Sequence, residues 1–315
     1  MNFGPVLSPD GSAARGDAPL AWALLGGGAL LFVLVMVLLA HALARPARPV
    51  RPLRWLLGGG LALPVVVLGT LAAVNLRHLL SPGLAAPADA LVVGVSAKAW
   101  WWQLRVQEPG HPDLLTANEL VLPVGRTVRL AMVSDDLIHS LWVPALAGKV
   151  DLLPGRVQHL VLRTDQAGRW RGPCAEFCGL GHTQMVLQVV GLPQADYNAW
   201  LVNQRLPART PTSELQRRGL QHFIALRCHA CHTVRGVAQA LIGADDPDVD
   251  GGGPDLTHLA SREYLGAGSL RNDDEGLRAW ITGAQRIKPG ARMPSYGHLD
   301  GATLDALVAY LGQLQ

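Results

Sequence analysis

The stretch Cys174-Ala-Glu-Phe-Cys178-Gly-Leu-Gly-His182-Thr-Gln-Met185 places four side chains that can bind a metal close together: two thiols, an imidazole and a thioether. Sulfur and imidazole ligands together favour copper, zinc or iron over hard cations. Gly179 and Gly181 allow the backbone to turn tightly enough for both sulfurs and the imidazole to face one point. The stretch therefore predicts a metal site held by a tight loop.

A second imidazole lies upstream, at His139 in Ser134-Asp-Asp-Leu-Ile-His139-Ser. Two histidines, two cysteines and a methionine are more ligands than one copper needs, and they suit two coppers bridged by both thiolates. A disulfide or a zinc site is the alternative for the two cysteines. Met185 and the glycine spacing favour copper over both alternatives.

The pattern Cys-x-Glu-x-Cys-Gly-x-x-His-x-x-Met, with an upstream histidine, resembles the dinuclear copper (CuA) loop of subunit II of haem-copper cytochrome c oxidases. Residues 139–156 are similar to the same family, and Trp100-Trp101-Trp102 resembles the aromatic stretch where electrons enter its copper domain. The resemblance runs from the first apolar segment to about residue 205. It implies that copper is held by the side chains of His139, Cys174, Cys178, His182 and Met185.

The resemblance also assigns roles to three further residues. It implies that Glu176 binds copper through its backbone carbonyl, and that its carboxylate reaches a Mg²⁺ ion at the interface with subunit I. Trp100 and Trp102 are implied to accept and relay electrons. Since neighbouring residues on a strand face opposite ways, we expect at least one tryptophan of this stretch to be a packing residue of the domain.

Bulk composition indicates a membrane protein of two or three domains. The chain has 315 residues, of which 49% are hydrophobic, and a formal net charge of +3. The four cysteines fall into two pairs with a chemical explanation, so none remains for a structural disulfide. Nucleic acid binding gets no support, because the basic excess lies beside the apolar segments, as Arg45, Arg48, Arg51, Arg54 and Arg77.

Two apolar segments, residues 20–44 and 55–76, contain no Asp, Glu, Lys or Arg. Each is long enough for a membrane-spanning helix. The basic loop between them, residues 45–54, is predicted to be cytoplasmic, which places both chain ends outside a bacterial plasma (inner) membrane, on the periplasmic side. Residues 1–19, polar with Pro and Gly, are predicted to be a disordered tail. The alternative for the first segment is a signal peptide cleaved after Ala42-Leu-Ala44.

Beyond the membrane segments, residues 91–193 contain short runs of β-forming residues separated by Gly, Pro and Asp. This spacing predicts an all-β Greek-key sandwich. The resemblance implies that the sandwich is cupredoxin-like, and with a closing helix the copper domain spans residues 91–206. Residues 207–214 are predicted to be a linker, in which Ser213 can cap the next helix.

The remaining residues, 215–315, follow a helical pattern and contain the sequence Cys228-His-Ala-Cys231-His232. This is a c-type haem attachment sequence, with two thioether links and His232 as axial ligand. These residues are therefore predicted to form an all-α class I cytochrome c domain. Met293 is the predicted sixth ligand, which raises the reduction potential. Pro254, in Gly253-Pro254, matches the cytochrome c loop that steadies the axial histidine. A zinc site would need further Cys or His residues in pairs, which the nearby histidines do not form.

Taken together, the chain resembles subunit II of a caa3-type cytochrome c oxidase, with two copper ions and one covalent haem c. The resemblance implies that a cytochrome c or another donor, soluble or membrane-bound, supplies electrons through haem c and CuA to subunit I, which reduces O2 within a complex of further oxidase subunits. Two alternatives stay open: a CuA subunit of a nitric oxide or nitrous oxide reductase system, and a membrane-anchored copper-delivery protein. The second would need neither Met185 nor a covalent haem. Residues 51–60 lack the acidic residue that this family links to a proton path.

Overall fold

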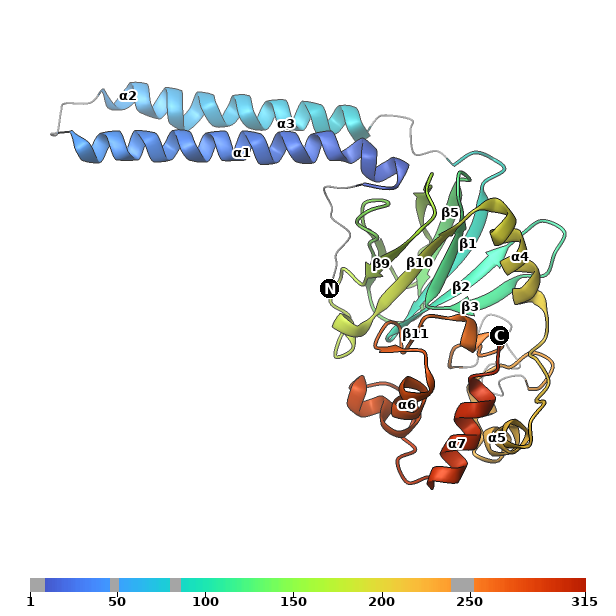
Figure 1. The fold of residues 1–315 in the computed structure, drawn as a ribbon. Helices are drawn as coiled ribbons and strands as arrows, with labels where there is room; N and C mark the ends of the chain where they lie inside the picture. The colour runs from blue at the N-terminus through green and yellow to red at the C-terminus, as the bar shows by residue number, and fades with distance from the viewer. Residues whose placement is uncertain (1–8, 46–50, 80–85, 239–251) are drawn as a thin grey trace. The chain divides into compact units, whose positions relative to one another are not determined.

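The computed structural model describes residues 9–45, 51–79, 86–238 and 252–315 (Figure 1). The chain divides into a helical unit, Asp17–Ala85, and a second unit made of Met1–Gly16 and Ala86–Gln315. Part of the predicted basic loop, residues 46–50, lies outside the described residues, as do residues 1–8 of the predicted tail.

The helical unit contains, within its described residues, two helices that are long and apolar enough to cross a membrane (Figure 1). The first is α1, Ser12–Ala44. The second comprises α2, Pro52–Trp55, a π-helical segment, Leu56–Ala62, and α3, Leu63–Leu79. The π-helical segment contains three consecutive glycines, which weaken the preference for regular α-helical geometry. Both helices expose their large apolar side chains, as a lipid-facing helix does.

The structure differs from the predicted disordered tail, because α1 begins at Ser12 and the residues before it pack on the β-sandwich. The backbone amide of Asp10 donates to Ala145 O at 2.8 Å, and Trp170 Nε1 donates to the carboxylate of Asp10 at 2.7 Å. Gly11 lies so close to the Leu146 backbone that a β-carbon would collide with it. This polar segment therefore forms hydrogen bonds to the sandwich.

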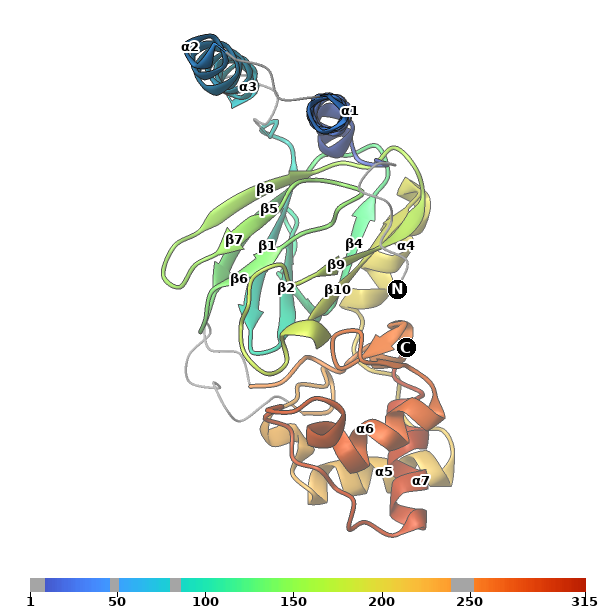
Figure 2. The ribbon, with the colours of Figure 1, turned by 90° about the vertical axis from the view of Figure 1, so that its left-hand side faces the viewer.

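The second unit contains a β-sandwich of two sheets, as predicted (Figure 2). The larger sheet has the strand order β3-β2-β1-β5-β8 and the smaller one β4-β10-β9. Each sheet is mixed, since β1 pairs in parallel with β5, and β10 with β4. The strands are β1 Leu91–Lys98, β2 Trp101–Gln107, β3 Leu114–Ala117, β4 Glu119–Pro123, β5 Val128–Ser134, β8 Gln158–Leu162, β9 Gly168–Pro173 and β10 Val186–Leu192.

Alternation of side chains builds the core of the sandwich. In β1 the residues Leu91, Val93, Val95 and Ala97 are buried and those between them are less so, which is the period of two expected of a strand with one face on the core. The closing helix is α4, Gln194–Arg205, which buries Tyr197 and Leu201 against the sheets. A short hairpin, β6 His139–Leu141 and β7 Val150–Leu152, extends the sandwich beside the predicted metal loop.

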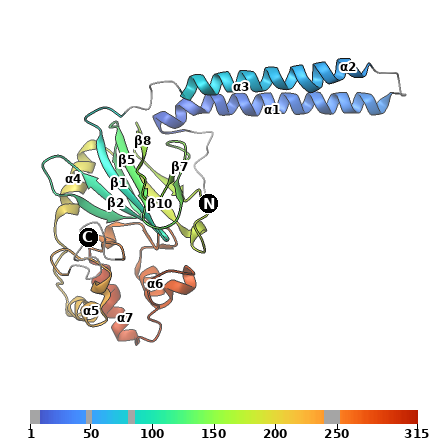
Figure 3. The same cartoon turned by 180° about the vertical axis from the view of Figure 1, so that it is seen from behind.

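The described part of the predicted cytochrome c domain, called the haem domain below, contains three α-helices (Figure 3). They are α5 Glu214–Ala225, α6 Asp274–Ile287 and α7 Gly301–Leu311. Ser213 caps α5, as the sequence suggests, in a capping box with Gln216. Helices α5 and α7 cross at Gly219, where a β-carbon would collide with the backbone of α7. The predicted linker is partly incorporated, because Ala208 is buried in this core and donates from its amide to Arg235 O at 2.9 Å.

Candidate metal centres

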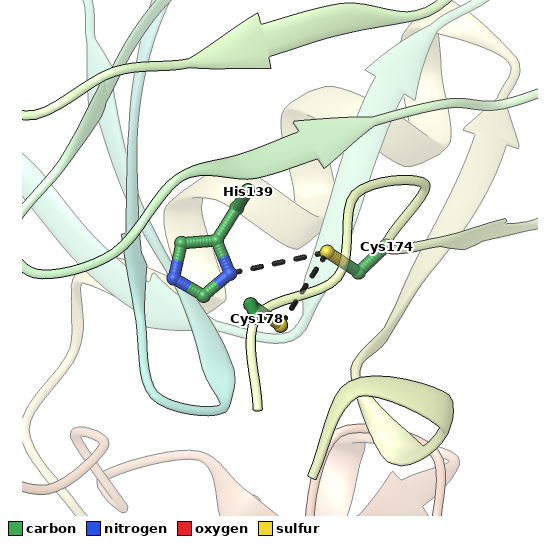
Figure 4. A group of neighbouring side chains, drawn as sticks. All are labelled: His139, Cys174 and Cys178. Atoms are coloured by element: carbon green, nitrogen blue, oxygen red, sulfur yellow. Dashed lines mark hydrogen bonds between the residues drawn. The ribbon is translucent and has the colours of Figure 1, made fainter. Parts of the chain in front are cut away.

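The predicted metal loop joins β9 to β10, two antiparallel neighbours, and so lies at one end of the smaller sheet. Cys174 Sγ lies 3.8 Å from Cys178 Sγ and 3.9 Å from Nδ1 of His139, which begins β6 (Figure 4). All three residues are buried. A sulfur–sulfur distance of 3.8 Å excludes a disulfide, so both thiols are free.

The remaining predicted ligands come from the same loop. His182 begins a short 3-10 turn, and its Nδ1 lies 3.7 Å from Cys178 Sγ. Met185 is fully buried, and its carbonyl accepts from the amide of Cys174 at 2.9 Å, which closes the base of the loop. The backbone carbonyl of Glu176 lies 3.3 Å from Cys174 Sγ, and its carboxylate lies 3.9 Å from Lys149 Nζ at the surface.

These contacts form a row of donor atoms: imidazole, thiol, thiol, imidazole. Each sulfur has its own histidine, His139 for Cys174 and His182 for Cys178. The neighbouring sulfurs occupy the middle of the row and the imidazoles its ends. Buried thiols flanked by imidazoles fit a soft transition metal and do not suit Mg²⁺ or Ca²⁺.

Asp136 is a residue of the site that the sequence motif did not predict. His139 Nε2 lies 2.9 Å from its carboxylate, which also accepts from the backbone amides of Ala99 at 2.7 Å and Leu137 at 2.6 Å. Burial acts to raise the pKa of Asp136, but these hydrogen bonds outweigh it and the pKa lies below its usual value. The ionised carboxylate holds a proton on Nε2 and leaves Nδ1 to face Cys174. Its position three residues before His139 was the available signal.

The two thiols titrate as a pair. The hydrogen bond from the thiol of Cys178 lowers the pKa of Cys174, and the resulting thiolate raises the pKa of Cys178. Burial acts to lower the pKa of His139, whereas its contacts with Cys174 and Asp136 raise it above the usual value. In the metal-free chain Cys174 therefore loses its proton easily, whereas Cys178 keeps its proton. Binding of a metal cation that displaces the proton of Cys178 is favoured.

The tryptophans of the predicted electron-accepting stretch differ in their surroundings. Trp102 is fully buried, with its ring 6.3 Å from that of His139. Trp100 is half-buried, and its Nε1 donates to the carbonyl of Cys178 at 2.5 Å. The indole of Trp100 covers Gly181, where a β-carbon would be 2.5 Å from the ring, so only glycine fits beneath it. Trp102 is a core residue, and Trp100 contacts the metal loop directly.

The haem attachment residues follow α5. Cys228 and Cys231 carry free, half-buried thiols, and Cys228 lies in a 3-10 turn, Cys228–Ala230. His232 Nδ1 donates to the carbonyl of Pro254 at 2.8 Å, since a carbonyl can only accept. A β-carbon at Gly253 would be 2.6 Å from the His232 ring, so the loop approaches the ring closely. This arrangement fits an axial ligand with a fixed ring orientation.

Met293 is half-buried in the irregular segment between α6 and α7. Tyr296, three residues later, packs against the same core as Cys228. Burial raises the pKa of Tyr296, and the charges of Cys228 and Cys231 raise it further, so this segment passes near the attachment cysteines. The role of Met293 as sixth ligand stays a prediction.

The sandwich with its thiol and imidazole row, joined to a helical domain with a Cys-x-x-Cys-His sequence, defines a class of electron-transfer proteins that carry two metal groups. Residues 93–191 match the family described as cytochrome c oxidase subunit II, periplasmic domain, and residues 216–315 match the cytochrome c family. The chain therefore joins a domain of the subunit II periplasmic family to a domain of the cytochrome c family, and these two matches imply copper and haem c as its metal groups.

Two bacterial relatives and one solved structure are similar to parts of this chain. Cytochrome c oxidase subunit 2 of Alkalihalophilus pseudofirmus is 34% identical over 227 residues, which cover 72% of this chain and 62% of the relative. The same subunit of Bacillus sp. (strain PS3) is 30% identical and covers 72% of this chain and 63% of the relative, so the chain spans less than two thirds of either. The solved periplasmic domain of subunit II from Bradyrhizobium japonicum is 23% identical with a TM-score of 0.36, covering 38% of this chain and 97% of that one.

Proposed function

We propose that this chain is the subunit of a caa3-type respiratory oxidase that receives electrons. In this proposal, Cys228, Cys231 and His232 would hold a haem c that accepts electrons one at a time from a donor, and the metal loop would hold a two-copper CuA centre that passes them to subunit I for the reduction of O2. The observation that carries the proposal is the row of donor atoms, in which two neighbouring thiols each have their own imidazole. Two metals held by both sulfurs, with one histidine each, would use every donor of this row.

Such a thiolate-bridged pair supplies a redox centre that takes up one electron with little change in geometry. The protein holds its ligands rigid: Asp136 orients His139, and the Cys174–Met185 backbone hydrogen bond closes the loop. The Glu176 carbonyl and Met185 would complete the two metal environments. The carboxylate of Glu176 is 44% exposed beside Lys149, and we infer that it reaches a Mg²⁺ shared with subunit I.

Trp100 is our candidate for the internal electron relay. Its indole N–H donates to Cys178, and a β-carbon at Gly290 of the haem domain would be 2.6 Å from the far edge of its ring. Gly290 lies three residues before Met293. The aromatic ring thus bridges the copper loop and the segment that carries the predicted haem ligand. Trp102, buried beside His139, remains a second candidate.

The packing of residues 10–14 supports the proposed orientation in the membrane. Because this segment is hydrogen-bonded to the sandwich, it lies on the same side of the membrane as the copper domain. If α1 and the second apolar helix each span the membrane, the chain returns to that side before β1, and Arg45, Arg51 and Arg54 lie near the helix ends on the opposite side. We infer a two-pass subunit with both metal domains on the periplasmic side, bound to subunit I and other oxidase subunits. A soluble or membrane-bound cytochrome c is the proposed donor.

Metal analysis of the purified full-length chain tests this function. We expect two copper ions and one covalent haem per chain, with a mixed-valence copper EPR signal, and O2 consumption when the chain is assembled with its partner subunits. A single blue copper or a preference for zinc would contradict the two-copper centre. Reduction of nitric or nitrous oxide in place of O2 would favour the reductase alternative.

Replacing Met293 with Ala is expected to lower the reduction potential of the haem, on the order of 0.1 V or more, because axial ligands set that potential over a wide range. The sulfur-to-iron charge-transfer band should disappear in an optical titration, while Cys228 and Cys231 keep the haem covalently attached. Met132 is a fully buried methionine of β5. Met132→Ala is therefore the control, and it should leave the band unchanged. Survival of the band in Met293→Ala would show that another residue is the sixth ligand.

A further inference from the structure

Lys288 is a buried cation at the contact between the copper domain and the haem domain. It follows α6 directly, and the residue is only 3% exposed. Its Nζ donates to three backbone carbonyls: Trp100 at 2.7 Å, Gln184 at 2.8 Å and Gly266 at 2.8 Å. Two of these acceptors belong to the copper domain, and the third belongs to the turn between β11, Tyr264–Leu265, and β12, Leu270–Arg271, of the haem domain.

The three acceptors match the ammonium group, which has three N–H donors and no acceptor. Arginine, with a planar fork of donors, does not suit three converging carbonyls. This preference matters because the chain has three lysines, at 98, 149 and 288, and its other 24 basic residues are arginines. Burial lowers the pKa of Lys288 to about 7.

Other contacts across the same boundary surround Lys288. Gln184 Nε2 donates to the carbonyl of Ile287 at 2.6 Å, and the amide of Val186 donates to Ala267 O at 2.9 Å. Gln184 and Val186 flank Met185, a predicted copper ligand, and Ile287 precedes Lys288 on the segment that leads to Gly290 and Met293. The hydrogen bonds of Lys288 thus join the two segments that carry the predicted metal ligands.

We propose that Lys288 is a positioning residue for electron transfer from haem to copper, which holds the haem domain against the copper loop with Trp100 between them. This inference rests on the proposed function. One ammonium group fixes the Trp100 backbone, the Gln184 carbonyl in the metal loop and the β11–β12 turn in a single arrangement. Transfer within the chain then proceeds from a preset geometry and needs no docking step between the two domains.

Lys288→Met in the full-length chain with both metal groups tests the proposal. We expect flash-initiated haem-to-copper transfer to slow roughly tenfold or more, since hydrogen bonds to a charged group are lost from the contact. The copper reduction potential should fall, because a positive charge that favours the reduced state is removed. In the metal-free chain, the amide of Val186 should exchange faster, while that of Val308 in α7 should stay protected.

Two further variants separate position from charge. Lys288→Arg keeps the charge but cannot serve three converging carbonyls, so transfer should slow while the copper potential stays near that of the parent chain. Lys98→Met is the matched control, since Lys98 forms its ion pair with Asp135 and its cation–π contact with Trp101 inside the copper domain. It should leave the transfer rate and Val186 exchange unchanged.

An unchanged transfer rate and unchanged Val186 exchange in Lys288→Met would overturn the proposal. If that variant fails to fold, an unchanged rate in Lys288→Arg would overturn it equally. Failure of the proposed function has a different signature: the parent chain itself would then lack the two-copper or haem spectrum, whereas Val186 exchange in the metal-free chain reports on Lys288 alone.

Discussion

Replacing Cys178 with Ser is expected to abolish the proposed two-copper centre. Cys178 is buried, and its Sγ lies 3.8 Å from Cys174 Sγ and 3.7 Å from His182 Nδ1. Its sulfur is therefore one of the two middle donors of the row. Even an outer hydrogen-bond partner of a metal ligand is worth about 10- to 100-fold in affinity, and loss of a bridging ligand should cost more. Copper analysis and EPR should show at most one copper per chain and no mixed-valence signal.

Cys228→Ser is the matched control for this change, because it removes a thiol of the other pair. It should break one covalent link to the haem and leave two coppers bound. Asp136→Asn provides a graded comparison: both ligand pairs remain, but His139 loses its ionised partner, so copper should bind more weakly without loss of the mixed-valence signal. Two coppers retained in Cys178→Ser would contradict the bridging role of this cysteine.

Replacing Trp100 with Ala is expected to slow haem-to-copper electron transfer by about tenfold or more, equivalent to ~1.4 kcal/mol in the barrier. The ring donates to Cys178 and approaches Gly290, so its removal opens a gap between the copper loop and the haem domain. Both metal spectra should persist. Flash-initiated reduction of the haem, followed by the appearance of reduced copper, measures the rate.

Trp101→Ala is the control, because Trp101 is the adjacent half-buried tryptophan and its ring contacts Lys98. It should leave the transfer rate unchanged. If Trp100 is only a packing residue, Trp100→Ala will lower the free energy of unfolding and leave the rate intact. An unchanged rate in a correctly metallated Trp100→Ala chain would therefore refute the relay, whatever its effect on stability.

Much of this protein could be predicted from its sequence because the relevant chemistry is local. The cysteines of each pair lie within five residues of one another, and His182 and His232 follow them closely. A loop or a single turn is sufficient to bring such residues together, so spacing alone identifies the two metal motifs. The two apolar segments are equally local, since length and composition decide whether a helix can span a membrane. The copper ligand set and the cupredoxin fold were reached through family resemblance to those motifs.

Only the tertiary structure decided how distant segments meet. The prediction of a disordered tail was wrong for residues 10–14 because their hydrogen-bond partners, Ala145 and Trp170 among them, are far along the chain. The alternation of a strand shows that neighbouring tryptophans face opposite ways, but the packing of the sheets decides that Trp102 is buried and Trp100 contacts the metal loop. The sequence around Lys288 does not predict its contacts, because its three acceptors are carbonyls from three separate segments of the chain. Every residue has a backbone carbonyl, so only their convergence in space marks the site.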